Sequence, residues 1–450
     1  MAGGEFPPIY NVSGALTLVG TRKEALIGLP LSVENVSDTA FHNSPNGLAC
    51  QTVPLARVAQ AEGTPVYVYA AHIVRRQFSV FDAAFKKHPH TVHYALKANS
   101  TLGILRLLHS LGSAADANSS GEIDVALRAG FTPNQIVFTG VGKRSEDLAK
   151  AVSLGLKAIN AESIGELERI DAIAAARGQR ATVALRVNPD IESMSHPHIS
   201  TGASRDKFGV ALSEAPAICR EMATRPGLRI VGIHVHIGSQ IVTVEPLRRA
   251  AATAVDLAQT LMAEGLPLEH VDLGGGVGIS YDGTPGLDLT AYAEALLKEM
   301  SGSGLTLMLE PGRFIVGPAG ALVSRVIDVK SHPDGKTFVV LDAGMTECLR
   351  PALYGARHRV IAVESRVGAD CIVDVVGPVC ESSDSFGTDY QLPPMQVDDL
   401  VAILDTGAYG AAMSSNYNRR PMPAEVLVED GAWTLIRRRQ TVEAMLAQEV

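Results

Sequence analysis

Residues 91–122 read TVHYALKANSTLGILRLLHSLGSAADANSSGE, and this stretch contains the repeating unit that decides the fold. A β-rich run, Thr91–Lys97, ends in a polar side chain, and a helical segment leads to a second run, Ala114–Asn118. Ser119 and Glu122 then have the spacing of a capping box, which marks the start of the next helix. The order strand, helix, strand favours parallel strands, because a parallel crossover usually runs through a helix.

The same unit recurs along the chain up to residue 310. The β-rich runs are Thr91–Lys97, Ala114–Asn118, Gln135–Gly140, Lys157–Glu162, Thr182–Asn188, Ile230–His236, His270–Gly275 and Leu305–Glu310. Eight alternating strand and helix units predict a closed (β/α)8 TIM-type barrel, and a doubly wound open sheet is the alternative. The polar residues at the ends of the runs favour the barrel, because barrel enzymes hold their chemistry at strand C-termini.

After residue 312 the pattern changes to short β-rich runs separated by turn residues. These runs are Ala321–Lys330, Lys336–Asp342, Arg359–Glu364, Cys371–Val376, Leu400–Leu404 and Glu425–Glu429. They predict a C-terminal antiparallel β-domain, a sandwich or barrel, over residues 312–450. The run Thr64–Tyr69 predicts that residues 51–70 contribute a strand to the same domain before the barrel begins. The barrel would then span 71–311, and residues 1–50 would form an irregular extension to which we attach no role.

Composition excludes several classes of protein. Hydrophobic residues make up 46% of the 450-residue chain and charged residues 19%, which is enough apolar material for a large core. The 39 basic and 48 acidic residues give a net charge of −9, which argues against binding to nucleic acid or to an anionic membrane. No stretch approaches the roughly 20 apolar residues of a membrane helix, and the N-terminus lacks a signal-peptide pattern. Five cysteines without a Cys-x-x-Cys motif predict a protein of the reducing cytoplasm.

Two features suit the binding of a small phosphorylated ligand. Lys97 ends a buried-looking run, so we expect its pKa to fall, which would make it a candidate amine for a Schiff base. A lysine whose amine extends to solvent is the alternative. Residues 272–278 read DLGGGVG, and bare backbone amides in such a loop are able to cradle a phosphate. A tight turn is the alternative for a glycine run.

Polar residues at the ends of later runs also have two interpretations each. His234 and His236 alternate on one predicted strand, where ring stacking or burial is favoured over metal binding because no third ligand has suitable spacing. Glu310 either holds a protonated ring nitrogen or forms a salt bridge with Arg313. Cys380 is either a proton donor or a buried thiol. Together, these features suit pyridoxal 5′-phosphate: the lysine would bind its aldehyde, the glycine loop its phosphate, and Glu310 its pyridine nitrogen.

The chain resembles the diaminopimelate decarboxylases, a family of pyridoxal-phosphate decarboxylases with the alanine racemase-like fold. The resemblance runs from about Leu55 to the C-terminus. Its motifs are Tyr94–Asn99, His196–Gly202, Lys207–Gly209, His236–Gln240, Gly274–Gly276, Glu310–Arg313, Arg350–Tyr354, Gly377–Glu381 and Gly407–Tyr409. His198 stands where the family has tyrosine, a difference that bears on a lid contact alone.

The resemblance implies a role for each matched position. Lys97 would carry the cofactor covalently, His236 would stack on its ring, and Glu310 would pair with the ring nitrogen. The implied cofactor contacts are Lys97, His236, Ser239, Gly275, Gly276, Glu310, Pro311, Gly312, Arg313 and Tyr409. The implied substrate contacts are Arg313, Arg350, Tyr354, Glu381 and Tyr409. Cys380 would reach the site from the partner subunit of a homodimer and donate a proton, and no metal is implied.

The activity implied is the decarboxylation of meso-2,6-diaminopimelate to L-lysine and CO2, the last step of lysine biosynthesis. A related decarboxylase of arginine, ornithine or carboxynorspermidine is one alternative, although Arg350 suits a substrate with a distal carboxylate. An amino acid racemase is another, but the Cys380-Glu381 pair has the character of a decarboxylase feature. A non-enzymatic pyridoxal-phosphate binding protein would resemble the barrel alone.

Overall fold

The computed structural model describes residues 39–191, 202, 206–364, 366 and 368–450. Most of the predicted N-terminal extension lies outside these residues, and so does His198. In the described part of the chain, no helix has both the length and the apolar character needed to cross a membrane.

Eight parallel strands form a closed ring. They are β5 (His90–Ala95), β6 (Ala114–Ala117), β7 (Ile136–Phe138), β8 (Ala158–Ala161), β9 (Ala181–Asn188), β11 (Leu228–His234), β12 (His270–Asp272) and β13 (Thr306–Leu309). The ring closes because β8 pairs with β9 while β13 pairs with β5. A short strand, β10 (Val210–Ala211), adds to β9 outside the ring. The predicted TIM-type barrel is therefore confirmed over an open sheet.

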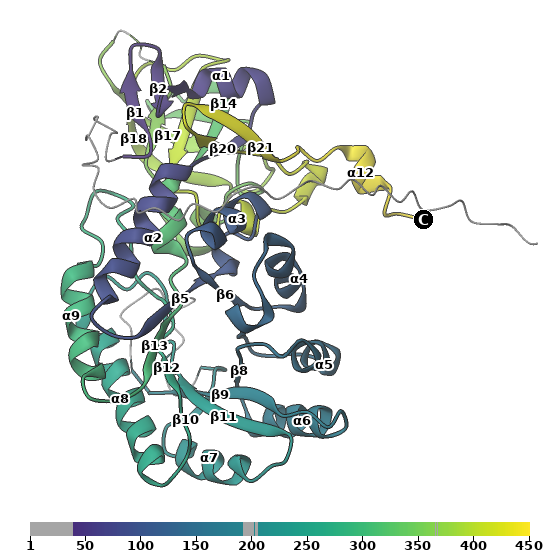
Figure 1. Ribbon diagram of the computed structural model, residues 1–450. Helices are drawn as coiled ribbons and strands as arrows, with labels where there is room; N and C mark the ends of the chain where they lie inside the picture. The colour runs from purple at the N-terminus through teal and green to yellow at the C-terminus, as the bar shows by residue number, and fades with distance from the viewer. Residues whose placement is uncertain (1–38, 192–201, 203–205, 365, 367) are drawn as a thin grey trace, which may run out of the picture. The chain divides into compact units, whose positions relative to one another are not determined.

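Helices surround the ring of strands (Figure 1). They are α2 (Ala71–Phe85), α3 (Leu102–Ser110), α4 (Ser120–Ala129), α5 (Ser145–Leu154), α6 (Ile164–Ala175), α7 (Ala215–Ala223), α8 (Val244–Ala263) and α9 (Leu289–Met300). Strands covered on both sides read as nearly continuous apolar runs, and β6 is buried at every position. The Ser119 hydroxyl caps α4 by accepting a hydrogen bond from the Glu122 amide at 3.1 Å. The Ser163 hydroxyl caps α6 in the same way.

The second domain is built on a mixed sheet. Its strands are β4 (Val66–Ala70), β14 (Gly320–Ser331), β15 (Thr337–Leu341), β16 (Val360–Ala362), β17 (Cys371–Val376), β18 (Ser385–Leu392), β19 (Leu400–Leu404), β20 (Ala424–Glu429) and β21 (Ala432–Arg437). Most neighbours are antiparallel, as predicted, whereas β15 and β17 pair in parallel, and so do β4 and β20. The strand before the barrel, β4, lies between β14 and β20 and so belongs to this sheet.

Some strands were not predicted. β18 contains Gly387 and Asp389 and has few consecutive apolar residues, and β21 is a largely exposed strand at the end of the sheet. The segment predicted as irregular also forms strands. Within it, β1 (His42–Ser44) pairs with β2 (Gly47–Cys50), and β2 also pairs with β3 (Val53–Pro54), which lies just after the segment, so the three form a small antiparallel sheet. Its turn-forming residues, which suggested irregular structure, make the tight connection between β1 and β2.

Candidate active site

Lys97 lies just beyond the barrel strand that was predicted to carry it. β5 ends at Ala95, and Lys97 occupies a short 3-10 helix, Leu96–Ala98. Its Nζ lies 3.3 Å from Oδ2 of Asp116, which is fully buried on β6. Burial lowers the pKa of Lys97, but the carboxylates of Asp116 and Glu310 outweigh it and raise the pKa above its usual value. The predicted fall in the pKa is therefore wrong for this structure, because the prediction took account of burial without these two anions.

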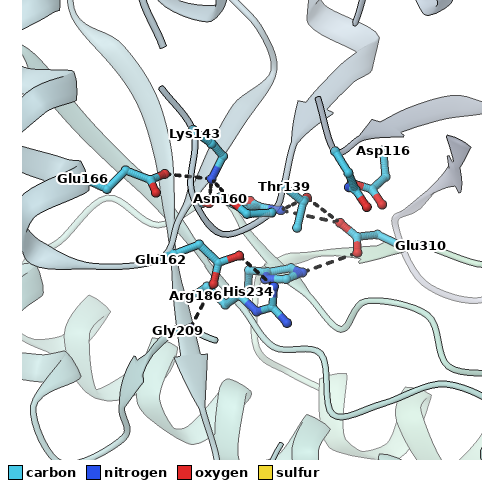
Figure 2. A network of polar contacts seen from close by, with 12 residues as sticks. Asp116, Thr139, Lys143, Asn160, Glu162, Glu166, Arg186, Gly209, His234 and Glu310 are labelled. Atoms are coloured by element: carbon cyan, nitrogen blue, oxygen red, sulfur yellow. Dashed lines mark hydrogen bonds and ion pairs between the residues drawn. The ribbon is translucent and has the colours of Figure 1, made fainter. Parts of the chain in front are cut away.

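Glu310 follows the last barrel strand and is 3% exposed. Its Oε1 accepts hydrogen bonds from the Thr139 hydroxyl at 3.3 Å and from Asn160 Nδ2 at 3.5 Å. Its Oε2 lies 3.4 Å from His234 Nε2 (Figure 2). Burial raises the pKa of Glu310, but His234 and Lys97 together hold it below its usual value. The carboxylate is therefore ionised, with polar neighbours at both of its oxygens.

Arg313 does not pair with Glu310, so the predicted alternative of a local salt bridge is wrong. Its guanidinium donates to the Tyr281 hydroxyl at 2.6 Å and to the Ser239 hydroxyl at 3.0 Å. It also lies over the Tyr409 ring, 4.7 Å from the centroid. The Tyr409 amide in turn donates to the carbonyl of Ala98 at 2.8 Å, which ties the second domain to the segment carrying Lys97.

The glycine loop after β12 lets two backbone segments approach closely. Gly274 and Gly276 have φ values of 64° and 91°, which favour glycine. A Cβ on Gly275 would collide with the carbonyl oxygen of Glu310. The Gly275 amide donates to His236 Nδ1 at 3.2 Å, so this amide is engaged within the protein. His236 itself lies beyond β11, which ends at His234, so strand alternation does not give the two histidines a shared face.

Most of the residues implied to bind the cofactor line one cavity at the C-terminal end of the barrel strands. Its lining is Ala95, Lys97, His236, Ser239, Gly276, Val277, Glu310, Gly312, Arg313 and Tyr409. Gly275 and Pro311 adjoin this lining in the chain without being part of it. Lys97 and Glu310, the oppositely charged residues of the cavity, come from neighbouring strands. Lys97 follows β5, Glu310 follows β13, and these two strands pair in the barrel.

Arg350 lies beside this cavity and belongs to the second domain. It begins the short helix α11 (Arg350–Tyr354) and is 5% exposed. Its Nη1 contacts His358 Nε2 at 2.6 Å, and its guanidinium lies 4.3 Å from the centroid of the Tyr281 ring. Within the described ranges, no carboxylate lies at ion-pair distance from Arg313 or Arg350. A buried cation without a counter-ion is costly, so this pair of arginines indicates a site for anionic groups of a ligand.

Cys380 and Glu381 do not join this site within one chain. They lie in the loop between β17 and β18, where both are exposed. Asn418 Nδ2 lies 3.5 Å from the Cys380 sulfur, and the Tyr417 hydroxyl donates to Glu381 at 2.5 Å. Neither residue lines the Lys97 cavity. Tyr354, the remaining residue implied to bind substrate, is half-buried at the end of α11.

Several buried polar residues near the cavity were not among the site residues predicted from the sequence. Glu162 accepts from Arg186 at 2.8 Å and from the Gly209 amide at 2.9 Å, and Lys143 pairs with Glu166 at 2.7 Å (Figure 2). The Glu166 carboxylate pairs with Lys143, while the Glu166 amide donates to the Ser163 hydroxyl. For Asp116 a signal was present, because an acid within the apolar run Ala114–Asn118 has to be buried with a partner.

Comparisons with known proteins agree with the fold and show the family of the chain. The family model described as the pyridoxal-binding domain of pyridoxal-dependent decarboxylases matches residues 71–317. A diaminopimelate decarboxylase of Neisseria meningitidis serogroup A is 45% identical over 403 residues, covering 90% of this chain and 99% of the relative. A diaminopimelate decarboxylase of Pseudomonas aeruginosa is 42% identical over 89% of this chain and 96% of the relative.

Solved structures give the same result. The Helicobacter pylori diaminopimelate decarboxylase complexed with L-lysine superposes with a TM-score of 0.85 at 40% identity, covering 88% of this chain and 99% of that one. The M. jannaschii enzyme in co-complex with L-lysine gives a TM-score of 0.87 at 34% identity, covering 92% of this chain and 98% of that one. The chain therefore belongs to the diaminopimelate decarboxylase family of pyridoxal-dependent decarboxylases.

Proposed function

We propose that this protein removes CO2 from meso-diaminopimelate and releases L-lysine, using pyridoxal phosphate held on Lys97. The observation that carries the proposal is the placement of two buried arginines, without carboxylate partners in the described part of the chain, beside the Lys97 cavity. The two relatives solved with L-lysine bound belong to the same family, which supports the choice of product.

The residues of the cavity fit pyridoxal phosphate. Lys97 offers an amine for the aldehyde carbon, and Glu310 offers an ionised, buried carboxylate for the ring nitrogen. Ser239, Gly276 and Tyr409 would hold the phosphate, with the positive charge of Arg313 beside it. When bound, this cofactor supplies a pyridinium ring that takes up the electron pair left behind as CO2 departs.

The residues of this chain would then perform three tasks. Glu310 holds a proton at the ring nitrogen, because an ionised carboxylate stabilises the protonated form of its partner. Arg350 binds the distal carboxylate of the substrate through charge-assisted hydrogen bonds. Lysine lacks that carboxylate, so it binds more weakly and leaves. Cys380 of the partner subunit of a homodimer donates a proton to the α-carbon, a role supported by its exposed position away from the Lys97 cavity of its own chain.

Related activities fit the site less well. Arginine and ornithine end in a cationic group, which Arg350 would repel across a short, desolvated distance. An amino acid racemase also fits less well, because racemisation needs a base on each face of the α-carbon. A non-enzymatic pyridoxal-phosphate binding protein would resemble the barrel alone, whereas Arg350 lies in the second domain.

Release of CO2 from a panel of amino acids tests the proposal. The holoenzyme is given meso-diaminopimelate, lysine, arginine and ornithine in separate reactions, and the CO2 is measured. We expect release from meso-diaminopimelate in large excess over the other three. Faster release from arginine or ornithine would assign the chain to a related decarboxylase, and release from none of the four would refute the enzymatic proposal.

A further inference from the structure

Tyr281 stands between the two buried arginines. It lies in the irregular segment between β12 and α9, and none of the sequence motifs includes it. Its hydroxyl accepts a hydrogen bond from Arg313 Nη1 at 2.6 Å. The face of its ring receives the guanidinium of Arg350 at 4.3 Å from the centroid. One half-buried side chain therefore contacts both cations. Arg350 lies close to the ring face, whereas Arg313 bonds to the hydroxyl and lies farther from the ring, 5.8 Å from its centroid.

His358 supports Arg350 from another direction. Its Nδ1 lies 2.8 Å from the Leu404 carbonyl oxygen, which is able only to accept a hydrogen bond, so Nδ1 carries the proton. Nε2 is then free to accept from Arg350 Nη1 at 2.6 Å. The rings of His358 and Tyr281 meet edge to face, with centroids 5.1 Å apart. Burial and the charge of Arg350 lower the pKa of His358 to about 3, so the ring stays neutral at pH 7.

These contacts orient the arginines without neutralising them. A tyrosine and a neutral histidine offer a π-face, a hydroxyl and a lone pair, but no negative charge. An aspartate or glutamate at the same place would hold the guanidinium more strongly, and it would also cancel the charge that a ligand has to meet. The Nε atoms of Arg313 and Arg350 are both buried without a hydrogen-bond partner among the described residues.

We propose that Tyr281 is a positioning residue whose ring fixes Arg350 for the distal carboxylate of the substrate. The inference rests on the proposed function, since it is the diaminopimelate distal carboxylate that Arg350 binds. Tyr281 thereby determines specificity without touching the reacting carbon. Its ring sets the direction of Arg350, and its hydroxyl hydrogen bond to Arg313 keeps the ring in place.

Two substitutions separate the two parts of Tyr281. Tyr281→Phe keeps the ring beneath Arg350 and removes the hydroxyl, and Tyr281→Leu removes both. Losing a desolvated cation–π contact should weaken binding of the distal carboxylate about 5- to 30-fold in Tyr281→Leu. In Tyr281→Phe the same binding should change by less than about threefold, because the aromatic face remains. Tyr292→Phe is the matched control, because Tyr292 is a buried tyrosine of α9 that packs against Phe85.

The measurements use the holoenzyme and a probe that is not turned over. Binding of pimelate, a seven-carbon dicarboxylate without amino groups, is followed by calorimetry. KM and kcat for meso-diaminopimelate, inhibition by lysine and the thermal midpoint are measured on the same proteins. We expect Tyr281→Leu to weaken pimelate binding and raise KM about 5- to 30-fold, with kcat and lysine inhibition within about twofold of wild type. Lysine is insensitive because it has no distal carboxylate.

The possible failures are distinguishable. If wild type turns over meso-diaminopimelate and Tyr281→Leu binds pimelate as tightly as wild type does, the positioning role is refuted and the proposed function stands. If kcat, lysine inhibition and thermal midpoint all fall together in Tyr281→Phe, Tyr281 has only a structural role and the inference is overturned. If wild type neither binds pimelate nor releases CO2 from meso-diaminopimelate, the proposed function fails and the inference fails with it.

Discussion

Replacing Glu310 with glutamine changes one atom and removes the buried charge that would hold the cofactor ring protonated. In the structure, the carboxylate receives hydrogen bonds from Thr139 and Asn160 on one oxygen and faces His234 on the other. A glutamine oxygen placed toward Thr139 and Asn160 leaves its NH2 group facing His234 Nε2. His234 Nε2 accepts that hydrogen bond in the tautomer that carries its proton on Nδ1. We therefore expect Glu310→Gln to fold and to keep the cofactor.

The expected loss is in the rate of decarboxylation. A charge-assisted hydrogen bond contributes about 1.5–3 kcal/mol, and a neutral amide does not stabilise a proton on the ring nitrogen. Because 1.36 kcal/mol corresponds to a factor of ten in rate, kcat should fall about 10- to 150-fold. The assay is CO2 release at saturating cofactor and substrate, with cofactor absorbance and the thermal midpoint measured on the same protein.

Thr139→Val is the matched control for this substitution. It removes one hydrogen bond of 3.3 Å to the same carboxylate and leaves the charge in place. At 3.3 Å this bond is well beyond the usual O–H···O length of about 2.7–2.8 Å, so it is weak although its acceptor is charged, and kcat should fall no more than about fivefold. A Glu310→Gln enzyme with the turnover of wild type would show that the charge is not needed. An equal loss in both variants would assign the effect to geometry.

Two further predictions concern the covalent site and the dimer. Lys97→Ala should abolish the absorbance band of the lysine-bound cofactor, because Lys97 is the one lysine among the described residues that line the cavity, and an unchanged band would mean that another lysine holds the cofactor. Lys97→Ala and Cys380→Ala homodimers should each be nearly inactive, whereas subunit exchange between equal amounts should restore about a quarter of wild-type activity, because half the dimers then have one intact site. No recovery after confirmed exchange would place Cys380 in the site of its own chain.

The barrel was predictable because its signal is repeated. Each strand is buried on both sides, so each reads as a short apolar run that ends in a polar residue, and eight such runs reinforce one another. β18 and β21 gave no such signal. One of them is interrupted by Gly387 and Asp389, and the other is an exposed strand at the edge of its sheet. These two segments form strands because they pair with neighbouring strands, and a local sequence pattern carries no information about that pairing.

The cavity brings together residues that the sequence had marked, whereas the electrostatics around Lys97 were not predicted. Lys97, Glu310 and Arg313 were marked by strand ends and by motif. The direction of the pKa shift of Lys97 was not predicted correctly. It depends on Asp116, 19 positions later in the chain, and on Glu310, which follows the last barrel strand. Tyr281 lies in a loop beside a turn sequence and has no periodic pattern. Its importance becomes visible only when Arg313 and Arg350 are seen on either side of it.

The pairing of β4 explains how two domains share one cavity. β4 lies in the second domain's sheet, between β14 and β20, and the chain passes from Ala70 directly into the first barrel helix. The chain returns to the same sheet only a few residues after Arg313. The covalent chain therefore joins the sheet to the barrel close to both ends of the barrel sequence, and the hydrogen bond from the Tyr409 amide to the Ala98 carbonyl adds a third connection beside Lys97. Because these connections join the two domains beside the Lys97 cavity, Tyr281 would position Arg350 without also having to hold the domains together.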